Sequence, residues 1–155
     1  MIGSELTELL ESPCSLIVGT LDARGLPDAS RAWGVEVLDD HTLRMLLSTQ
    51  APVTRANVEQ GGAVALTATH FSTFESVQLK GRALAVEEAT AADRIRFEAY
   101  CAGAVRAIAE SDGTPEELVA RFKTASVYAC TMQVDALFDQ TPGRSAGTQL
   151  APVPS

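Results

Sequence analysis

The segment from Leu47 to Asn57 carries the residue types that most clearly suggest ligand binding. It connects an expected strand to an expected helix, and the connection carries hydroxyl and amide side chains. Thr54 and Arg55 fall in the first turn of the helix. The start of a helix offers unpaired backbone N–H groups and the positive end of the helix dipole, and both favour a phosphate. Thr54 adds a hydroxyl donor, and Arg55 adds a guanidinium fork that matches phosphate oxygens. The segment therefore predicts a phosphate site, with an ordinary helix start and a solvated arginine as the alternative.

A second set of polar side chains alternates along a later segment that is expected to be a strand. Gln78, Lys80 and Arg82 fall on one face of it, with Gly81 between them. The pattern fits a solvent-facing edge strand protected by charge. It also fits a polar face along a planar ligand, because Gln78 offers both a donor and an acceptor to a ring edge. Arg31, on an earlier strand, is a further positive group for the phosphate site.

Composition narrows the classes of partner. The 155 residues contain 12 Lys and Arg against 20 Asp and Glu, which gives a net charge of −8 and a pI near 4.7. Such a chain lacks the basic surplus that displaces counterions from a nucleic-acid backbone, and it is equally unsuited to an anionic membrane surface. The expected ligands are therefore small molecules, and neither nucleic acid nor membrane is expected as a partner.

Several familiar catalytic and metal-binding patterns are missing. The sequence has no GxSxG, P-loop, HExxH or GxGxxG motif. Two histidines are too few for a multi-histidine metal site, so no metal is predicted. The three cysteines are far apart and form no CxxC, which argues against a disulfide framework or a zinc ribbon. The N-terminus lacks a signal-peptide pattern and no uncharged stretch is long enough to span a bilayer, so a cytoplasmic location is expected.

Hydrophobic periodicity and turn residues predict the elements that must position these groups. Strands are expected at residues 15–21, 27–37, 42–47, 63–69, 75–87 and 127–134, and helices at about 4–12, at 52–59, at 91–110 and after residue 114. The first connections are far too short for parallel crossovers, so the strands pair antiparallel. About six antiparallel strands with interrupting helices indicate a small barrel with helices at its mouth or flank.

Three finer expectations concern helix starts and one strand. Ser4 is expected to cap the first helix, and Thr114 is expected to cap the last one in a capping box with Glu117. Strict alternation along residues 27–37 puts four side chains on one face, namely Arg31, Trp33, Val35 and Val37. The other face then carries Ser30, Ala32, Gly34 and Glu36.

Several stretches, taken in order, resemble the pyridoxamine 5′-phosphate oxidase-like family of flavin-binding split barrels. They are SLIVGTLDARGLPDASRAWG, STQAPVTRANVEQGGAVALT, VQLKGRALAV and FDQTPGRSAG. The resemblance covers Leu6 to Leu150 and implies a mainly β protein, a six-stranded antiparallel split barrel with peripheral helices. It also implies a homodimer with FMN in clefts at the subunit interface. Residues 1–140 then form the barrel domain, including a helical insertion at 90–124, and residues 141–155 form an irregular tail.

The resemblance also assigns binding roles to particular positions of this chain. The phosphate would be held by Arg31 and the Thr54–Arg55 pair, and Gln78 would reach the cofactor from the fifth strand. The strand-end segment beside the flavin ring would be Leu47, Ser48 and Thr49. These assignments imply an FMN-binding protein, a flavin-dependent oxidoreductase for a small-molecule substrate, with no catalytic acid or base named. A non-catalytic binder of flavin, deazaflavin or haem is the alternative.

This sequence departs from the family pattern and leaves some roles open. The common lysine of the phosphate pair is Arg55 here, and the residues that grip pyridoxal phosphate in the true oxidases have no evident counterparts, which puts vitamin B6 oxidation in doubt. Trp33 either stacks on a flavin or packs in the core or at an interface. His70 either serves a flavin or a haem, or is structural. The insertion at 90–124 either forms a lid or widens the dimer contact.

Overall fold

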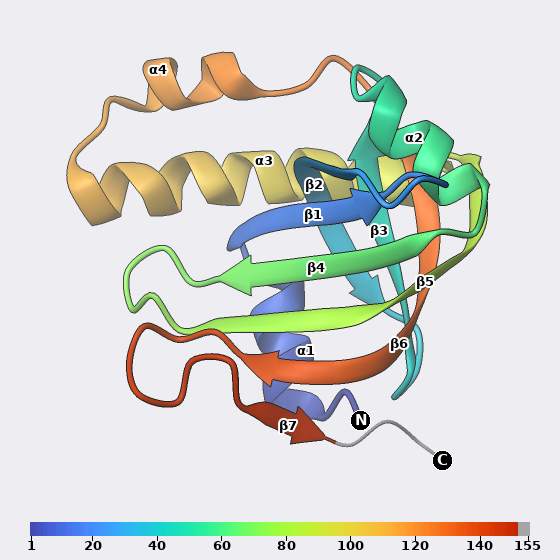
Figure 1. Ribbon diagram of the computed structural model, residues 1–155. Coiled ribbons are helices and arrows are strands. Elements are labelled where there is room, and N and C mark those ends of the chain that lie inside the picture. Colours follow the sequence, from blue (N-terminus) through green and yellow to red (C-terminus); the bar gives the residue numbers. More distant parts are fainter. Residues whose placement is uncertain (152–155) are drawn as a thin grey trace.

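Strands dominate the computed structural model, which describes residues 1–151 and wraps six long strands into a barrel flanked by helices (Figure 1). The strands are β1 (Ser15–Leu21), β2 (Pro27–Val37), β3 (Thr42–Ser48), β4 (Ala63–Thr69), β5 (Ser76–Glu88), β6 (Val127–Asp139) and the short β7 (Gln149–Ala151). The helices are α1 (Ser4–Glu11), α2 (Pro52–Glu59), α3 (Ala91–Asp112) and α4 (Glu116–Val119), followed by the 3₁₀ turn η1 (Ala120–Phe122). The predicted antiparallel barrel with peripheral helices is confirmed.

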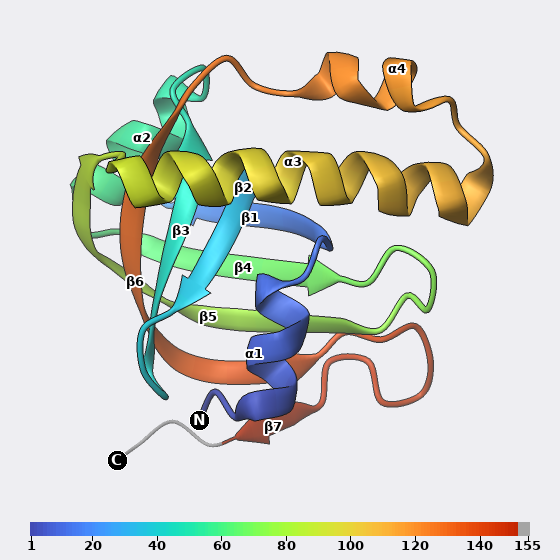
Figure 2. The same cartoon turned by 180° about the vertical axis from the view of Figure 1, so that it is seen from behind.

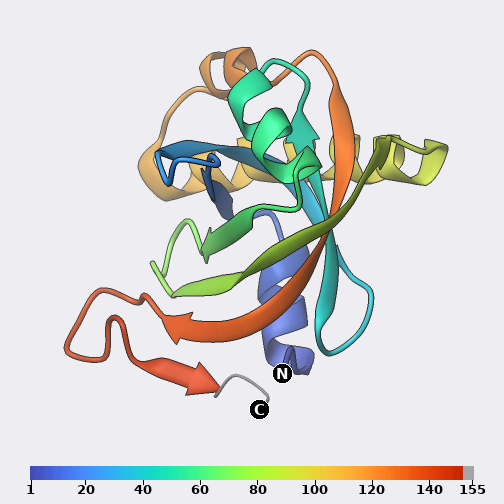
Figure 3. The same ribbon diagram turned by 45° about the vertical axis from the view of Figure 1, so that its right-hand side comes forward.

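Pairing between β3 and β6 closes the barrel. The strands follow the order β3-β2-β1-β4-β5-β6-β7, all neighbours are antiparallel, and β6 also pairs with β3 from Thr42↔Gln133 to Ser48↔Val127. Side chains that alternate along each strand fill the interior, among them Leu16 and Val18 of β1 and Leu66 of β4, all without exposed surface. The helix α2 covers one end of the barrel (Figure 3), and α1 lies beside β2 on the back (Figure 2).

The predicted alternation along β2 is wrong beyond Ala32, because the strand contains a bulge. The pairing of β2 with β3 shifts register between Ala32 and Val35, and Gly34 has a φ of 127°, which favours glycine. Ala32 and Val35 therefore both face the core, while Trp33 packs in a second cluster outside the barrel. The bulge separates Trp33 from Val35 and turns the indole towards the helices.

Both predicted helix caps and the predicted tail also need correction. Gly3 precedes α1 and no side chain caps it, and Ser4 is already helical. Pro115 precedes α4, which is only one turn long and carries no side-chain cap, so the capping box at Thr114 does not form. The expected irregular tail contributes β7, which pairs with β6. Pro152 and Pro154 of that tail lie outside the described residues.

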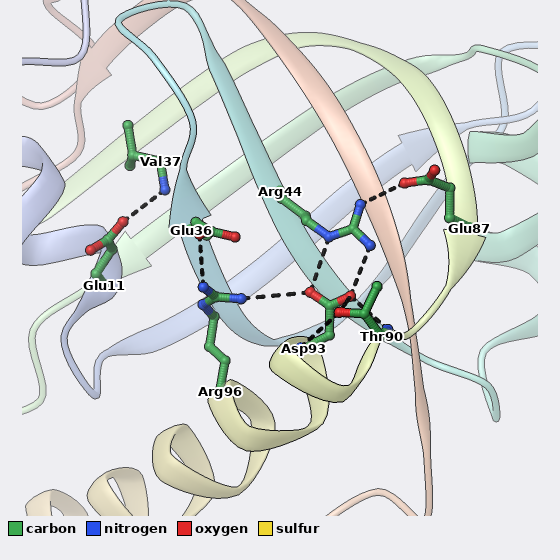
Figure 4. A network of polar contacts seen from close by, with 8 residues as sticks. All are labelled: Glu11, Glu36, Val37, Arg44, Glu87, Thr90, Asp93 and Arg96. Carbon is green, nitrogen blue, oxygen red and sulfur yellow. Dashed lines mark hydrogen bonds and ion pairs between the residues drawn. The ribbon is translucent and has the colours of Figure 1, made fainter.

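An ion-pair network fixes the start of α3 to the barrel (Figure 4). Arg44 of β3 donates two hydrogen bonds to the Asp93 carboxylate, at 3.0 and 2.8 Å, and a third to Glu87 at 2.6 Å. Thr90 and Asp93 form the capping box of α3. The hydrogen bonds from Arg44 hold the pKa of Asp93 far below its usual range. The network therefore sets where α3 begins.

Within residues 1–151, no helix combines the length and apolar character needed to cross a bilayer.

Candidate functional site

A cleft of about 370 Å³ lies between β2 and the α3–α4 helices. Its walls are mainly apolar, and four aromatic residues line it: Trp33, Phe71, Tyr100 and Phe122. The cleft depends on α3, which runs along the outside of the barrel, and on α4, which folds back beside α3 (Figure 2). A cleft of this volume and lining is typical of a small-molecule site that takes a flat, largely apolar ligand.

Arg31 supplies positive charge at this cleft. Its side chain is exposed, and within residues 1–151 it makes no hydrogen bond or ion pair. Two other basic residues line the cleft. Arg106 of α3 is exposed and, among the described residues, also makes no hydrogen bond or ion pair. Lys123 is paired with Glu98 and lies over the Phe97 ring, with 5.0 Å between Nζ and the ring centroid. Arg31 and Arg106 are therefore the unpaired cations of this cleft that are available to an anionic group of a ligand.

Trp33 contributes a donor without an acceptor. Its ring meets Phe97 edge-on, with 6.3 Å between ring centroids and an interplanar angle of 73°. Its indole N–H is buried and has no hydrogen-bond partner within the described residues. A buried N–H left unpaired costs about 1–3 kcal/mol, so a ligand with an acceptor atom at this wall would gain from it. The structure thus places Trp33 against the second hydrophobic cluster and in the wall of the cleft, and its stacking on a flavin stays a prediction.

Two further groups in the α3 wall are neutral at ordinary pH. The Tyr100 hydroxyl donates to the Cys14 carbonyl oxygen at 2.7 Å, and burial raises the tyrosine pKa. Burial also raises the pKa of the Cys101 thiol to about 11. Neither residue is therefore an ionised acid, base or nucleophile in this state. Tyr100 instead anchors α3 to the start of β1.

Thr54 and Arg55, the predicted phosphate pair at the start of α2, have side chains in different surroundings. Thr54 is fully buried: its hydroxyl donates to Asp28 at 2.7 Å and shares a hydrogen bond with the Ser30 hydroxyl at 2.9 Å, so it closes the barrel end instead of facing a ligand. Arg55 is half-buried and donates to Glu59 at 2.8 Å, and its guanidinium lies 4.8 Å from the centroid of the Tyr128 ring. Hydrogen bonding with Glu59 raises the pKa of Arg55, which stays positively charged.

The end of β3 forms a closed cluster of hydroxyl groups. Ser48 is buried and hydrogen-bonds Thr124 at 2.6 Å, and Thr49 hydrogen-bonds Ser126 at 2.6 Å. Leu47 has no exposed surface and belongs to the barrel core. Of the three residues assigned to the ring edge, Thr49 alone therefore presents an exposed side chain.

Gln78 lies on the outer face of the sheet, far from the other predicted residues. Its amide donates to Thr67 of β4 at 3.0 Å. The register runs from Arg31 to Ile17, from Ile17 to Thr67 and from Thr67 to Gln78, so three strand spacings separate Arg31 from Gln78. That distance is about 14 Å. Gln78 and Arg31 therefore share one row and one face of the sheet, but they do not meet within one chain.

Sequence reasoning missed most of the cleft. Phe97, Tyr100, Cys101 and Val105 share one stripe of the expected helix at 91–110, but no cleft was predicted beside them, and η1 was not expected at all. Tyr100 and Cys101 do pack inwards, but they also line the cleft because α3 covers β2 only in part. The signal that could have found the cleft is the length of the apolar stripe, which exceeds what one barrel face can cover.

Comparisons with known proteins agree with this architecture. The model of the pyridoxamine 5′-phosphate oxidase family matches residues 2–131. Group A Streptococcus HupZ is 21% identical, with a TM-score of 0.58 over 95% of this chain and 100% of that one. An F420 reductase is 17% identical, with a TM-score of 0.54 over 84% and 93% of the two chains. HutZ of Vibrio cholerae, described as a haem storage protein, is 20% identical, with a TM-score of 0.50 over 89% and 94%.

None of the curated proteins matches the chain. The solved structures named above are at most 21% identical to this chain, so they show the fold alone, and the proteins that share it include one named as a reductase and one named as a haem storage protein. The family match is different, because it covers residues 2–131 of the 155. The chain belongs to the pyridoxamine 5′-phosphate oxidase family.

Proposed function

We propose that this protein binds FMN and is a flavin-dependent oxidoreductase for a small molecule. The observation that carries the proposal is the joint placement of Arg31 and Trp33 in one aromatic-lined cleft. Arg31 offers an unpaired positive charge, and Trp33 offers a buried N–H without an acceptor. A planar ring system with polar edge atoms and a phosphorylated tail fits both groups.

The apolar walls fit the ring. Trp33 and Tyr100 border the cleft, and Phe122, with 79% of its surface exposed, lies at its rim. Such a surface on a lone helix end has no packing role in this chain, but a flat ligand would cover part of it. The ring would then be shielded from water by α3 on one side and by β2 on the other.

The phosphate end has two sources of attraction. Arg31 is one of them. The second is the start of α2, outside the lining of this cleft, where no side chain caps the helix beside Arg55. Because Arg55 is paired with Glu59, a phosphate must compete with that carboxylate for the guanidinium.

A second copy of this chain would complete the site. The outer face of β1 and β4 carries small or apolar side chains at Ile17, Gly19 and Ala65, which leave the sheet surface flat. Gln78 lies in the same row as Arg31, about 14 Å away, so a partner packed on this face can bring its own Gln78 to the cleft. The proposal therefore includes a homodimer.

When bound, FMN supplies the redox chemistry of its ring, and the protein supplies binding, orientation and electrostatics. In this chain Arg31 and Arg55 would hold the negative tail. Trp33 would offer its N–H to an acceptor on the ligand, and the α3 wall would keep bulk water out. No residue of the cleft is assigned as a catalytic acid or base.

A flavin fits the cleft better than a haem does. The cleft is lined by no histidine or methionine among residues 1–151, and its potential axial ligands are Tyr100 and Cys101. Burial raises the pKa of both, and their neutral forms are weak iron ligands. A deazaflavin shares the ring shape and the phosphate, so the test must separate it from FMN.

The test is the absorption spectrum of the purified protein, followed by titration of the ligand-free protein with FMN. We expect two flavin bands and tight binding, with riboflavin much weaker because it lacks the phosphate. Arg31→Ala should weaken FMN binding about 10- to 150-fold, as expected for the loss of a charge-assisted hydrogen bond. Arg24→Ala removes the same charge from an exposed turn residue and should leave affinity unchanged.

Four outcomes would overturn the proposal. They are an intense Soret band, binding of a deazaflavin in preference to FMN, failure to bind FMN at all, and equal affinity in Arg31→Ala and Arg24→Ala. Oxidation of NADH or NADPH by the loaded protein then separates an enzyme from a carrier. Sedimentation or light scattering should give a dimer.

A further inference from the structure

We propose that His70 is a positioning residue that holds Phe71 in the wall of the cleft, and that its protonation releases this wall. The inference rests on the proposed function, because the cleft is the site that it regulates. His70 follows β4 and begins the loop that leads to β5, and Phe71 comes directly after it.

The imidazole of His70 is an acceptor in this loop. Its Nδ1 atom accepts hydrogen bonds from the backbone N–H groups of Ser72 and Thr73, both at 3.3 Å, and the Ser72 hydroxyl lies 3.2 Å from it. A backbone N–H can only donate, so Nδ1 must carry a lone pair and the ring proton must lie on Nε2. The loop geometry thus requires the neutral imidazole.

The same loop contains a strained residue. Phe74 has a φ of 60°, which is uncommon for a residue other than glycine, and its ring is 61% exposed. Two backbone hydrogen bonds help to hold it, from His70 N to Glu75 O at 2.9 Å and from Phe74 N to His70 O at 3.1 Å. Because the exposed ring contributes little packing, the loop relies on hydrogen bonds. Among the side-chain ones, Thr73 Oγ1 accepts from Glu75 N and Ser76 Oγ donates to Phe74 O, while His70 alone accepts from both Ser72 and Thr73 beside Phe71.

Phe71 connects this loop to the cleft. It lines the 370 Å³ cleft and also a neighbouring cavity of about 220 Å³, to which His70 and Ser72 contribute. Phe71 therefore forms part of the wall between the two spaces. Both flanking residues take part in the Nδ1 hydrogen bonds, so the position of Phe71 follows the state of the imidazole.

Protonation reverses the role of Nδ1. The imidazolium ion carries a proton on both nitrogens, so it cannot accept from Ser72 and Thr73 and faces two donors instead. The charged group that lines the smaller cavity is Glu110 of α3, which joins Ser12 and Ser111 there. Its carboxylate attracts the imidazolium towards α3 and away from the loop. In acid the loop should therefore loosen and Phe71 should leave the wall.

The experiment follows the amide resonances of Ser72 and Thr73 by NMR from pH 8 to pH 5, with and without FMN. In the parent protein both amides should shift together in one transition, because both donate to the same Nδ1 atom. FMN affinity should fall about tenfold across the same range, the loss expected for one or two hydrogen bonds.

Two variants of His70 test whether its Nδ1 atom is needed as a hydrogen-bond acceptor. His70→Asn places an amide oxygen near the Nδ1 position and does not titrate, so it should keep the affinity found at pH 8 and lose the transition. His70→Ala should bind weakly at every pH. His41→Asn changes the other histidine, which lies beside Asp40 in the β2–β3 turn, and should titrate like the parent protein.

Amides of Ser72 and Thr73 that do not shift with pH, or a His70→Asn protein that shows the parent transition, would refute the role of His70. A protein that binds no FMN at any pH refutes the proposed function instead, and His70 is then judged on the amide shifts alone. If the variants fail to fold, the amide titration of the parent protein still decides.

Discussion

Replacement of Asp93 by asparagine should destabilise the protein strongly, because it removes the charge at the centre of the network that anchors α3. The Asp93 side chain is 2% exposed and accepts from Arg44, Arg96 and Thr90. Asparagine keeps the size but leaves the Arg44 guanidinium, which is 14% exposed, with Glu87 as its remaining anion. Breaking a buried ion pair on one side costs roughly 3–5 kcal/mol.

That loss is large against a total stability of about 5–15 kcal/mol. With a urea m-value of about 1–3 kcal/mol/M, a loss of 3 kcal/mol moves the unfolding midpoint down by about 1–3 M. Asp112→Asn is the matched control, because Asp112 lies at the exposed end of the same helix and accepts only a local hydrogen bond from Thr114. It should change the free energy of unfolding by less than about 1 kcal/mol.

The pH dependence gives a second, independent readout. Hydrogen bonds from Arg44 lower the pKa of Asp93 in the folded state, whereas the unfolded carboxyl titrates near its ordinary value of about 3.9. The stabilisation is therefore fully present above that value and is lost as the pH falls through the folded pKa. The difference in stability between the parent protein and Asp93→Asn should shrink below about pH 4. Equal midpoints for Asp93→Asn and Asp112→Asn at pH 7, at one protein concentration, would refute this account of the network.

Three further outcomes follow from the packing. Alanine at Gly81 would bring a Cβ within 1.8 Å of the Gln133 carbonyl oxygen, so Gly81→Ala should cost about 2–3 kcal/mol in a denaturation curve. Gly19→Ala, where the nearest atom lies at 3.9 Å, should change stability by less than about 0.5 kcal/mol, and equal losses would contradict the geometry. Thr54→Val removes the hydroxyl that donates to Asp28, so it should lower the free energy of unfolding by about 1–3 kcal/mol. It should leave FMN affinity within about twofold, and a large loss of affinity would place Thr54 in the binding site. Burial raises the pKa of the Cys14 and Cys101 thiols to about 11 and of the Cys130 thiol to about 12. A thiol reagent at pH 8 should therefore label none of them in the native protein and all three after unfolding. Rapid labelling of one thiol in the native protein would argue against this burial.

Local patterns in the sequence predict most of the elements but not their irregularities. The expected bounds of β1, β2, β4 and α2 agree with the structure, because each segment has clear periodicity and a turn residue or proline at its ends. The bulge at Gly34 breaks the period of two, and the simple alternation has no place for it. The capping box of α3 uses Thr90 and Asp93, whereas the Thr114 pattern matches the rule better and does not form.

The candidate site is less accessible to sequence reasoning than the fold. Residue type correctly marks Arg31 as a free positive group, but Thr54 lies on the inner side of α2 because that helix closes the barrel end. Which face of α2 turns inwards depends on contacts such as the hydrogen bond from Asn57 of α2 to Thr20 of β1, two residues that lie 37 apart in the chain. The cleft itself arises from three segments that meet only in the folded chain.

The position of β6 between β3 and β5 has a consequence for synthesis on the ribosome. Until residues 127–139 have left the exit tunnel, β3 and β5 both present open edges with unpaired N–H and C=O groups. Open edges of this kind pair readily with other chains, so nascent or truncated forms that stop within α3 should aggregate instead of retaining part of the barrel. Formation of β6 thus pairs the open edges of both β3 and β5 and closes the barrel.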